Sequence, residues 1–129
     1  MKHPNAKLFD KLYAAFKSGN YNTMLSHCDE KVTFQIAGQS KLAGKYDRMN
    51  FESGLGVKLK ELSGGTFTTE IHDVMAGDLH AMVLMTNKVT RAGKTLEYRS
   101  VHVWRIQNGK PLAGYEYPRD MYQFDLIWS

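Results

Sequence analysis

Hydrophobic residues near the start of the chain recur with the spacing of α-helices. Over residues 4–18, Leu8, Leu12 and Phe16 return every four positions, and Gly19 follows where a helix commonly ends. A shorter helix is expected over residues 21–28. Each segment carries one apolar face, so both helices are predicted to pack against a core.

The spacing of hydrophobic residues then changes twice along the chain. Over residues 31–36, apolar Val32, Phe34 and Ile36 alternate with polar positions, which predicts a strand, and residues 38–44 are expected to form a loop. A third helix is expected to follow, with Asp47 as its N-cap. Its apolar positions are Phe51, Leu55, Leu59 and Leu62.

Four long alternating segments make up most of the second half. They are expected as strands over residues 66–75, 80–90, 95–107 and 110–117, separated by glycine-containing turns. Asp120 is expected to cap a last short helix, and the alternative is that it lines the mouth of a cavity. Short connections favour antiparallel pairing, and helices followed by strands favour an α+β class. We predict a single domain over residues 1–129, a cone in which three N-terminal helices pack on a curved, mostly antiparallel sheet.

Composition narrows the classes of function. The 129-residue chain has 43% hydrophobic residues and a formal net charge of +4, from 17 basic and 13 acidic residues that are scattered along it. This pattern predicts a solvated surface and no nucleic-acid footprint. No segment has the length of a membrane span, and the single cysteine, Cys28, fits a reducing compartment, so a cytoplasmic protein is expected.

Residues 101–110 hold the first candidate chemistry. They are expected to form a strand, a type I′ turn at residues 108–109 and a returning strand. Alternation puts His102 on the same face as Trp104. With a two-residue turn, strict pairing places the residue before Glu116 opposite His102. Glu116 therefore reaches the face of His102 only through a β-bulge or a longer turn.

Four phrases along the chain resemble the SnoaL-like branch of the nuclear-transport-factor-2-like superfamily, which includes ketosteroid isomerases and polyketide cyclases. They are AAFKSGN at 14–20, VTF at 32–34, LAGKY at 42–46 and VHVWRIQNGK at 101–110. In this order they cover nearly the whole chain. The resemblance implies the cone-shaped fold, which carries enzymes, binding modules and assembly subunits alike.

The family's functional residues carry over in part. In the isomerases a carboxylate base lies on the first strand, and Gln35 stands at the matching position here. Their tyrosine matches Leu12, with Tyr13 next along the helix, and their protonated acid matches His102. In the cyclases a histidine and an aspartate lie on successive strands, and His102 and Glu116 match them with the same separation. Glutamate replaces aspartate, which moves the carboxylate by one methylene.

Two functions fit these residues. One is an enzyme that abstracts a proton next to a carbonyl, as in isomerisation or aldol cyclisation, with His102 and Glu116 as its acid–base groups. The other is a non-catalytic ligand-binding or interaction module of the same fold. An assembly subunit with a nearly filled cavity is a third class.

Both leading functions call for the same kind of ligand, a small hydrophobic or aromatic-like molecule. The residues expected to bind it are Tyr13, Gln35, Tyr98 and Trp104. No cofactor or metal is expected. A homodimer is predicted, because an apolar outer sheet face that includes Val101 and Val103 needs a partner.

Overall fold

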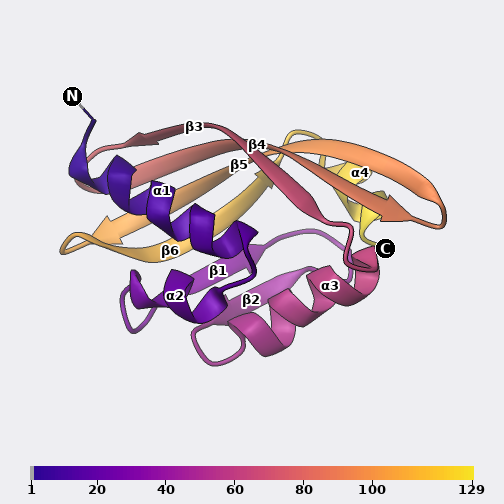
Figure 1. Cartoon of the computed structure of the whole chain (residues 1–129), viewed down its shortest axis with the longest axis horizontal. Coiled ribbons are helices and arrows are strands. Elements are labelled where there is room, and N and C mark those ends of the chain that lie inside the picture. The colour runs from indigo at the N-terminus through magenta and orange to yellow at the C-terminus, as the bar shows by residue number, and fades with distance from the viewer. Residues whose placement is uncertain (1) are drawn as a thin grey trace.

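The computed structural model describes residues 2–129, which form four α-helices, one π-helical segment and six strands (Figure 1). The helices are α1 (Pro4–Lys17), α2 (Tyr21–Ser26), η1 (Phe51–Gly56, the π-helical segment), α3 (Val57–Ser63) and α4 (Met121–Ile127). The strands are β1 (Thr33–Ile36), β2 (Gly44–Asp47), β3 (Thr68–Ala76), β4 (His80–Arg91), β5 (Lys94–Gln107) and β6 (Lys110–Pro118).

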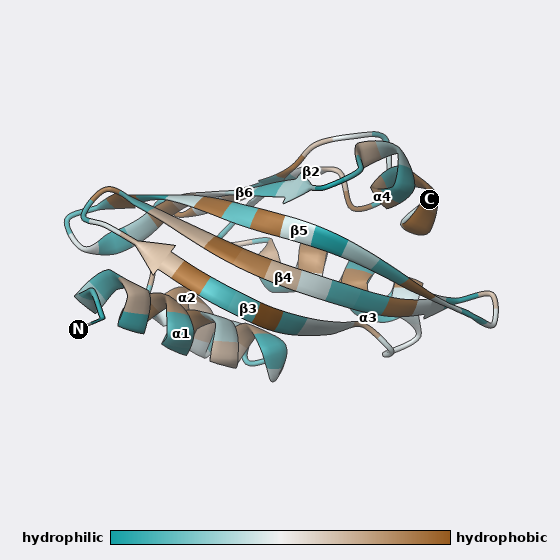
Figure 2. Ribbon diagram, turned by 90° about the horizontal axis from the view of Figure 1, so that it is seen from above, coloured by the Kyte–Doolittle hydropathy of each residue, from teal (hydrophilic) through white to brown (hydrophobic). Residues whose placement is uncertain are grey.

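All six strands form one sheet in the order β2-β1-β6-β5-β4-β3, in which only the β1–β6 pair is parallel. The sheet curves, and α1, α2 and α3 lie on its concave side (Figures 1 and 2). The α1 helix contacts β3 and β4, and α3 contacts β4. The predicted α+β class with a mostly antiparallel, curved sheet is therefore confirmed.

Strand β5 shows why the sequence folds into a two-faced sheet. Its side chains alternate in burial, with Ser100, His102 and Trp104 buried on the concave side while Arg99 and Arg105 are exposed on the other. The same alternation appears as bands of hydropathy along β3, β4 and β5 (Figure 2). Burial of the apolar set favours this one register over any shift by a single residue. The predicted inward face of β5 is confirmed.

The β5–β6 hairpin turns at Asn108 and Gly109, whose φ angles are 52° and 74°. Two consecutive positive φ angles define the type I′ turn that the sequence predicts. A bulge follows at once, because Ile106 pairs with Pro111 while Arg105 pairs with Ala113. Leu112 is the extra residue of the bulge, and every later residue of β6 is shifted by one position relative to strict pairing.

The expectation for the segment between β1 and α3 was wrong in two respects. Residues 44–47, predicted as the end of a loop and a helix cap, form strand β2, which pairs with β1 at the edge of the sheet. The Asp47 carboxylate accepts hydrogen bonds from the backbone N–H groups of Met49 and Asn50, so it stabilises a turn and caps no helix. The helix itself begins as the π-helical η1.

The grouping of three N-terminal helices is not confirmed. Strand β1 lies between α2 and the third helical segment, as the order of the predicted elements has it, and the structure adds β2 at the same place. The α4 helix packs against β5 and β6, and its N-cap Asp120 accepts a hydrogen bond from the backbone N–H of Gln123, as predicted. Among residues 2–129, no helix combines the length and apolar character that crossing a membrane requires.

Candidate functional site

His102 and Glu116 face each other across the β5–β6 ladder inside the cone. The two residues are direct cross-strand partners, and the His102 Nε2 atom lies 2.8 Å from Glu116 Oε1. Each side chain is only 8% exposed. Strict pairing would have put Tyr115 in the place of Glu116, so the bulge at Leu112 is what brings the carboxylate to the histidine. The sequence prediction named this bulge as a condition of the pair.

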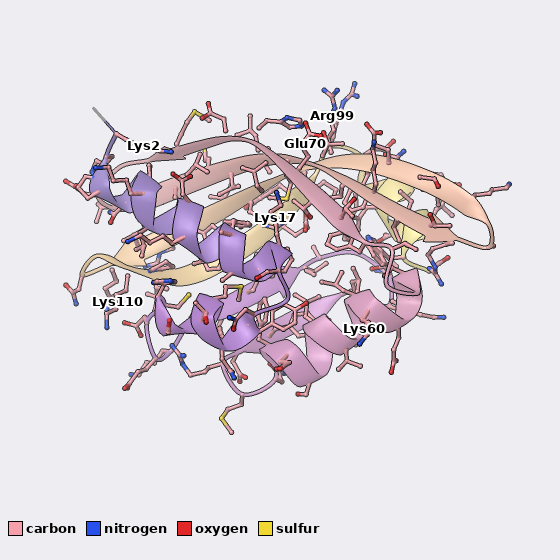
Figure 3. The ribbon with its side chains drawn as sticks, viewed as in Figure 1. Lys2, Lys17, Lys60, Glu70, Arg99 and Lys110 are labelled. Carbon is pink, nitrogen blue, oxygen red and sulfur yellow. The ribbon has the colours of Figure 1, made fainter. Side chains whose placement is uncertain are left out.

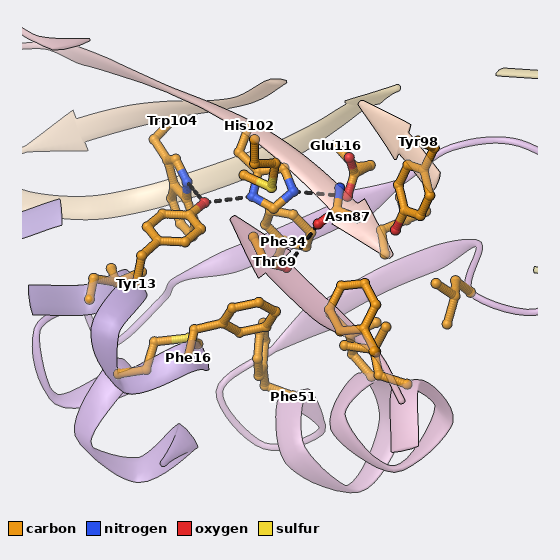
Figure 4. A pocket seen from close by; sticks show the side chains of 18 residues that line it. Tyr13, Phe16, Phe34, Phe51, Thr69, Asn87, Tyr98, His102, Trp104 and Glu116 are labelled. Carbon is orange, nitrogen blue, oxygen red and sulfur yellow. Dashed lines mark hydrogen bonds and ion pairs between the residues drawn. The ribbon is translucent and has the colours of Figure 1, made fainter. Parts of the chain in front are cut away.

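Tyr13 of α1 joins the pair from the opposite side of the cavity. Its hydroxyl lies 2.6 Å from His102 Nδ1 and accepts a hydrogen bond of 2.9 Å from Trp104 Nε1. Trp104 lies beside Phe34, and both rings cross Gly114, where a Cβ atom would come within 2.7 Å of each ring. We call the connected side chains Trp104, Tyr13, His102 and Glu116 the polar chain (Figure 4).

The donors and acceptors of the polar chain are consistent with two proton arrangements. With neutral His102, the Tyr13 hydroxyl donates to Nδ1 and the Nε2–H group donates to Glu116. With His102 protonated, Nδ1–H donates to the Tyr13 oxygen, and the Tyr13 proton becomes free to point elsewhere. In both arrangements Glu116 Oε2 is buried without a hydrogen-bond partner among residues 2–129. The second arrangement holds one proton more than the first, and the same heavy-atom positions accommodate both.

A cavity lies between the polar chain and the helices, with a volume of about 40 Å³. This is room for about two or three water molecules. Its wall is mostly apolar and includes Leu12, Phe16, Met24, Phe34, Phe51, Leu55, Leu59, Phe67 and Met85, together with Tyr13, His102, Trp104 and Glu116 (Figure 4). A low-polarity wall of this kind strengthens hydrogen bonds and ion pairs formed inside it.

The remaining predicted residues divide between the two sides of the sheet. Tyr98 lines the cavity, and its hydroxyl accepts a hydrogen bond from the indole of Trp128. Gln35 does not line the cavity. Because Phe34 and Ile36 point inward, Gln35 faces the convex side of β1, where it borders a separate surface hollow with Tyr115.

Sequence reasoning missed two polar residues of the cavity wall, Asn87 and Thr69. They pair directly across β3 and β4, and the Thr69 hydroxyl donates to Asn87 Oδ1 over 2.8 Å. A signal was present, because Asn87 is the only polar residue on the inward face of β4 between residues 81 and 89, where the others are Ala81, Val83, Met85 and Val89.

Burial changes the acidity of several groups in and near the cavity. It raises the pKa of the Tyr13 hydroxyl well above its usual value, although the hydrogen bond from Trp104 acts in the opposite direction. Burial likewise raises the pKa of the Tyr98 hydroxyl, with the Glu116 charge contributing. The pKa of the Cys28 thiol rises to about 12, mainly through burial. Tyr13 is therefore a proton donor at neutral pH, and Cys28 is no nucleophile.

Within the part of the chain that the structure describes, no three His, Cys, Asp or Glu side chains are grouped so that they could hold a metal ion. His72 lies on the outer side of the sheet, where its Nε2 atom is 2.6 Å from the Thr86 hydroxyl.

Solved structures with the same architecture identify the class of fold. Bal32a, from a soil-derived mobile gene cassette, is 29% identical over 97% of this chain and 96% of its own, with a TM-score of 0.87. An NTF2-like protein from Burkholderia thailandensis is 20% identical, with a TM-score of 0.85 and 98% of both chains covered. TerC, co-crystallised with polyporic acid, is 20% identical over 98% of this chain and 100% of its own, with a TM-score of 0.82.

The family follows from the sequence itself. A family model described as the SnoaL-like domain matches residues 9–111, which is most of the chain. The protein therefore belongs to the SnoaL-like family, as the four sequence phrases implied. None of the curated proteins matches the sequence.

Proposed function

We propose that this protein is an enzyme that transfers a proton next to a carbonyl group of a small, mostly apolar molecule bound in the cone. The observation that carries the proposal is the buried polar chain, in which a carboxylate with a free oxygen, a histidine and a tyrosine line one apolar cavity. A buried carboxylate oxygen without a partner is costly for a fold that uses it only as a structural element.

In the proposed step, Glu116 Oε2 takes a proton from the carbon next to the carbonyl. The C–H electron pair moves into the enolate, whose oxygen accepts a hydrogen bond from the Tyr13 hydroxyl. Protonated His102 supports this arrangement, because its Nδ1–H then occupies the tyrosine oxygen and leaves the Tyr13 proton for the ligand. Glu116 returns the proton to a different carbon, which completes an isomerisation without net gain or loss of protons.

The organic ligand of a structural relative adds support. TerC shares the fold and was co-crystallised with polyporic acid. We propose that this protein likewise binds an organic molecule inside the cone. Because the present cavity has a volume of only about 40 Å³, binding requires side chains of its apolar wall to move.

Proton transfer can be tested without knowledge of the natural substrate. The probe is 2-acetylnaphthalene in D₂O, and NMR measures deuterium incorporation at the methyl group next to the carbonyl. Wild-type protein is expected to accelerate the exchange over buffer. Glu116→Gln should slow the catalysed exchange by about a hundredfold or more. Glu97→Gln, on the exposed side of β5, is the matched control and should leave the rate unchanged.

A non-catalytic binding module is the second candidate, and one observation favours it. Both ring nitrogens of His102 already have protein partners, which is also what a purely structural histidine would show. Binding of 2-acetylnaphthalene without accelerated exchange would select this function and overturn the catalytic proposal.

We further propose a homodimer, formed through the convex face of the sheet, and a cytoplasmic location. Apolar residues gather on this face, where Met82 is 41% exposed and Tyr117 is 56% exposed beside half-buried Val101 and Val103. Light scattering at micromolar concentration should therefore give about twice the 14.7 kDa mass of one chain. Val103→Glu should reduce it to that of the monomer, and a wild-type monomer would contradict the proposal.

A further inference from the structure

The Asn87–Thr69 pair is a polar site on an otherwise apolar stretch of the cavity wall. Asn87 is 2% exposed and Thr69 is 8% exposed, and the two are direct partners across β3 and β4. The hydroxyl of Thr69 donates to Asn87 Oδ1 over 2.8 Å, which fixes the orientation of the amide.

This orientation leaves the other end of the Asn87 amide free. Its Nδ2 group carries two N–H donors, and neither has a hydrogen-bond partner among residues 2–129. Leaving such a donor unpaired in an apolar wall costs free energy, so a purely structural asparagine would be expected to use it. The free donor lines the same cavity as the polar chain (Figure 4).

The pair also lies where the cavity meets the outside. Thr69, Phe16, Leu59 and Phe67 line both the cavity and a larger outer groove of about 370 Å³. The groove runs between α1 and α3, which contribute Lys17 and Lys60 to it (Figure 3). The Thr69 side of the pair therefore borders the passage from this groove into the cavity.

The strand register gives the separation of the two polar sites. His102 pairs with Val83 of β4, and Asn87 is four residues further along that strand. At about 3.3 Å per residue, the two positions are roughly 13 Å apart along the strand. These are backbone positions, and both side chains line the same cavity. The separation favours contact of Asn87 with a group of the ligand other than the one that meets the polar chain.

We infer that Asn87, held by Thr69, recognises an oxygen acceptor at the end of the ligand far from the reacting carbonyl. The ligand class is then an elongated, mostly apolar molecule with oxygen acceptors at both ends. Its inner acceptor meets Tyr13, and its outer acceptor meets the Asn87 amide near the mouth of the cone. This inference rests on the proposed function in one respect, because it assumes that the ligand occupies the cavity beside the polar chain.

The test compares 2,6-diacetylnaphthalene, with carbonyl groups at opposite ends of a flat ring system, and 2-acetylnaphthalene, which has only one. Dissociation constants are measured by calorimetry. Wild-type protein is expected to bind the diketone about tenfold more tightly, the effect of one additional hydrogen bond to a buried donor. Asn87→Leu should abolish this preference while leaving the affinity for the monoketone nearly unchanged.

A matched pair of threonine variants keeps the test valid if Asn87→Leu fails to fold. Thr69→Val removes the hydroxyl that orients Asn87 and should reduce the diketone preference. Thr86→Val removes a hydroxyl of equal burial, 8% exposed, from the convex side of β4 and should leave the preference unchanged. Equal preference in wild type and both cavity variants would overturn the inference.

The outcome is separable from that of the proposed function. A diketone preference that depends on Asn87, with no deuterium exchange, supports the recognition site and rejects the enzyme. Accelerated exchange with a preference that does not respond to Asn87→Leu supports the enzyme and rejects the recognition site.

Discussion

The cavity wall carries two polar groups that differ in how fully their hydrogen bonds are used. In the polar chain, the indole donates to the hydroxyl, the hydroxyl pairs with Nδ1 of the imidazole, and Nε2 pairs with one carboxylate oxygen, so that the other carboxylate oxygen is left without a partner. In the Asn87–Thr69 pair, a single bond fixes the geometry and both amide N–H donors stay free. The first arrangement suits the movement of a proton within a fixed frame, and the second suits the binding of an external acceptor.

Substitutions in the two groups should therefore lower the stability of the protein by different amounts. Removal of one member of the polar chain leaves buried donors and acceptors that have no other hydrogen-bond partner. Removal of a member of the Asn87–Thr69 pair affects one bond.

The largest effect is expected from His102→Ala. It leaves the Glu116 carboxylate, 8% exposed, without its partner inside an apolar cavity. Leaving a buried carboxylate unpaired in this way should lower the free energy of unfolding by about 3–5 kcal/mol, measured by urea denaturation. His72→Ala, on the outer side of the sheet, is the control and should cost less than about 1 kcal/mol. Equal losses in the two variants would show that the polar chain is not a coupled unit.

A smaller loss is expected from Tyr13→Phe. The variant keeps the ring but leaves Trp104 Nε1–H and His102 Nδ1 without the hydroxyl that they share. We expect the free energy of unfolding to fall by about 1–3 kcal/mol. Catalysed deuterium exchange should slow together with it, because the enolate loses its hydrogen-bond donor. Tyr122→Phe, on an exposed position of α4, should change neither quantity.

The smallest effect is a difference in alkaline stability. A group whose folded pKa is raised stabilises the fold fully below its unfolded pKa, and this contribution is lost as the pH rises. The stabilising contribution of Cys28 is then lost between about pH 9.0 and 12. The contributions of Tyr13 and Tyr98 are lost above pH 10.0. Urea denaturation from pH 8 to 11 should show falling stability, with a shallower slope in Tyr13→Phe. Asn87→Leu should keep the wild-type slope, because it removes no titrating group.

The sequence predicted the strands of the meander, the type I′ turn and the inward face of β5 because each depends on local features. Alternation within β5 places His102 and Trp104 together whatever the neighbouring strand does. The position of Glu116 could be predicted only as conditional on a bulge, because no single residue in the sequence indicates that a bulge is present. The structure supplies that bulge at Leu112.

Gln35 and Tyr13 show the limits of reasoning by resemblance. Alternation in β1 already places Gln35 on the face opposite to the inward Phe34 and Ile36. The structure shows Gln35 on that outer face, and not in the cavity as the family match implied. Tyr13 reaches the site although the family match falls on Leu12, because α1 presents both residues to the core. Strand β2 could not be predicted, since Gly44–Asp47 has a single buried side chain and is held in place by pairing with β1.

The bulge at Leu112 has a consequence for changes in the length of the chain. Deletion of the Leu112 codon would remove the extra residue, and the hairpin could then pair regularly from its two-residue turn onward. Counting from the turn, Glu116 would still stand opposite His102. A deletion here is thus compatible with the site, whereas an insertion at the same point would move the carboxylate to the outer face. A relative that lacked one residue in this hairpin would retain the pairing, and an alignment that opened its gap elsewhere in β6 would conceal it.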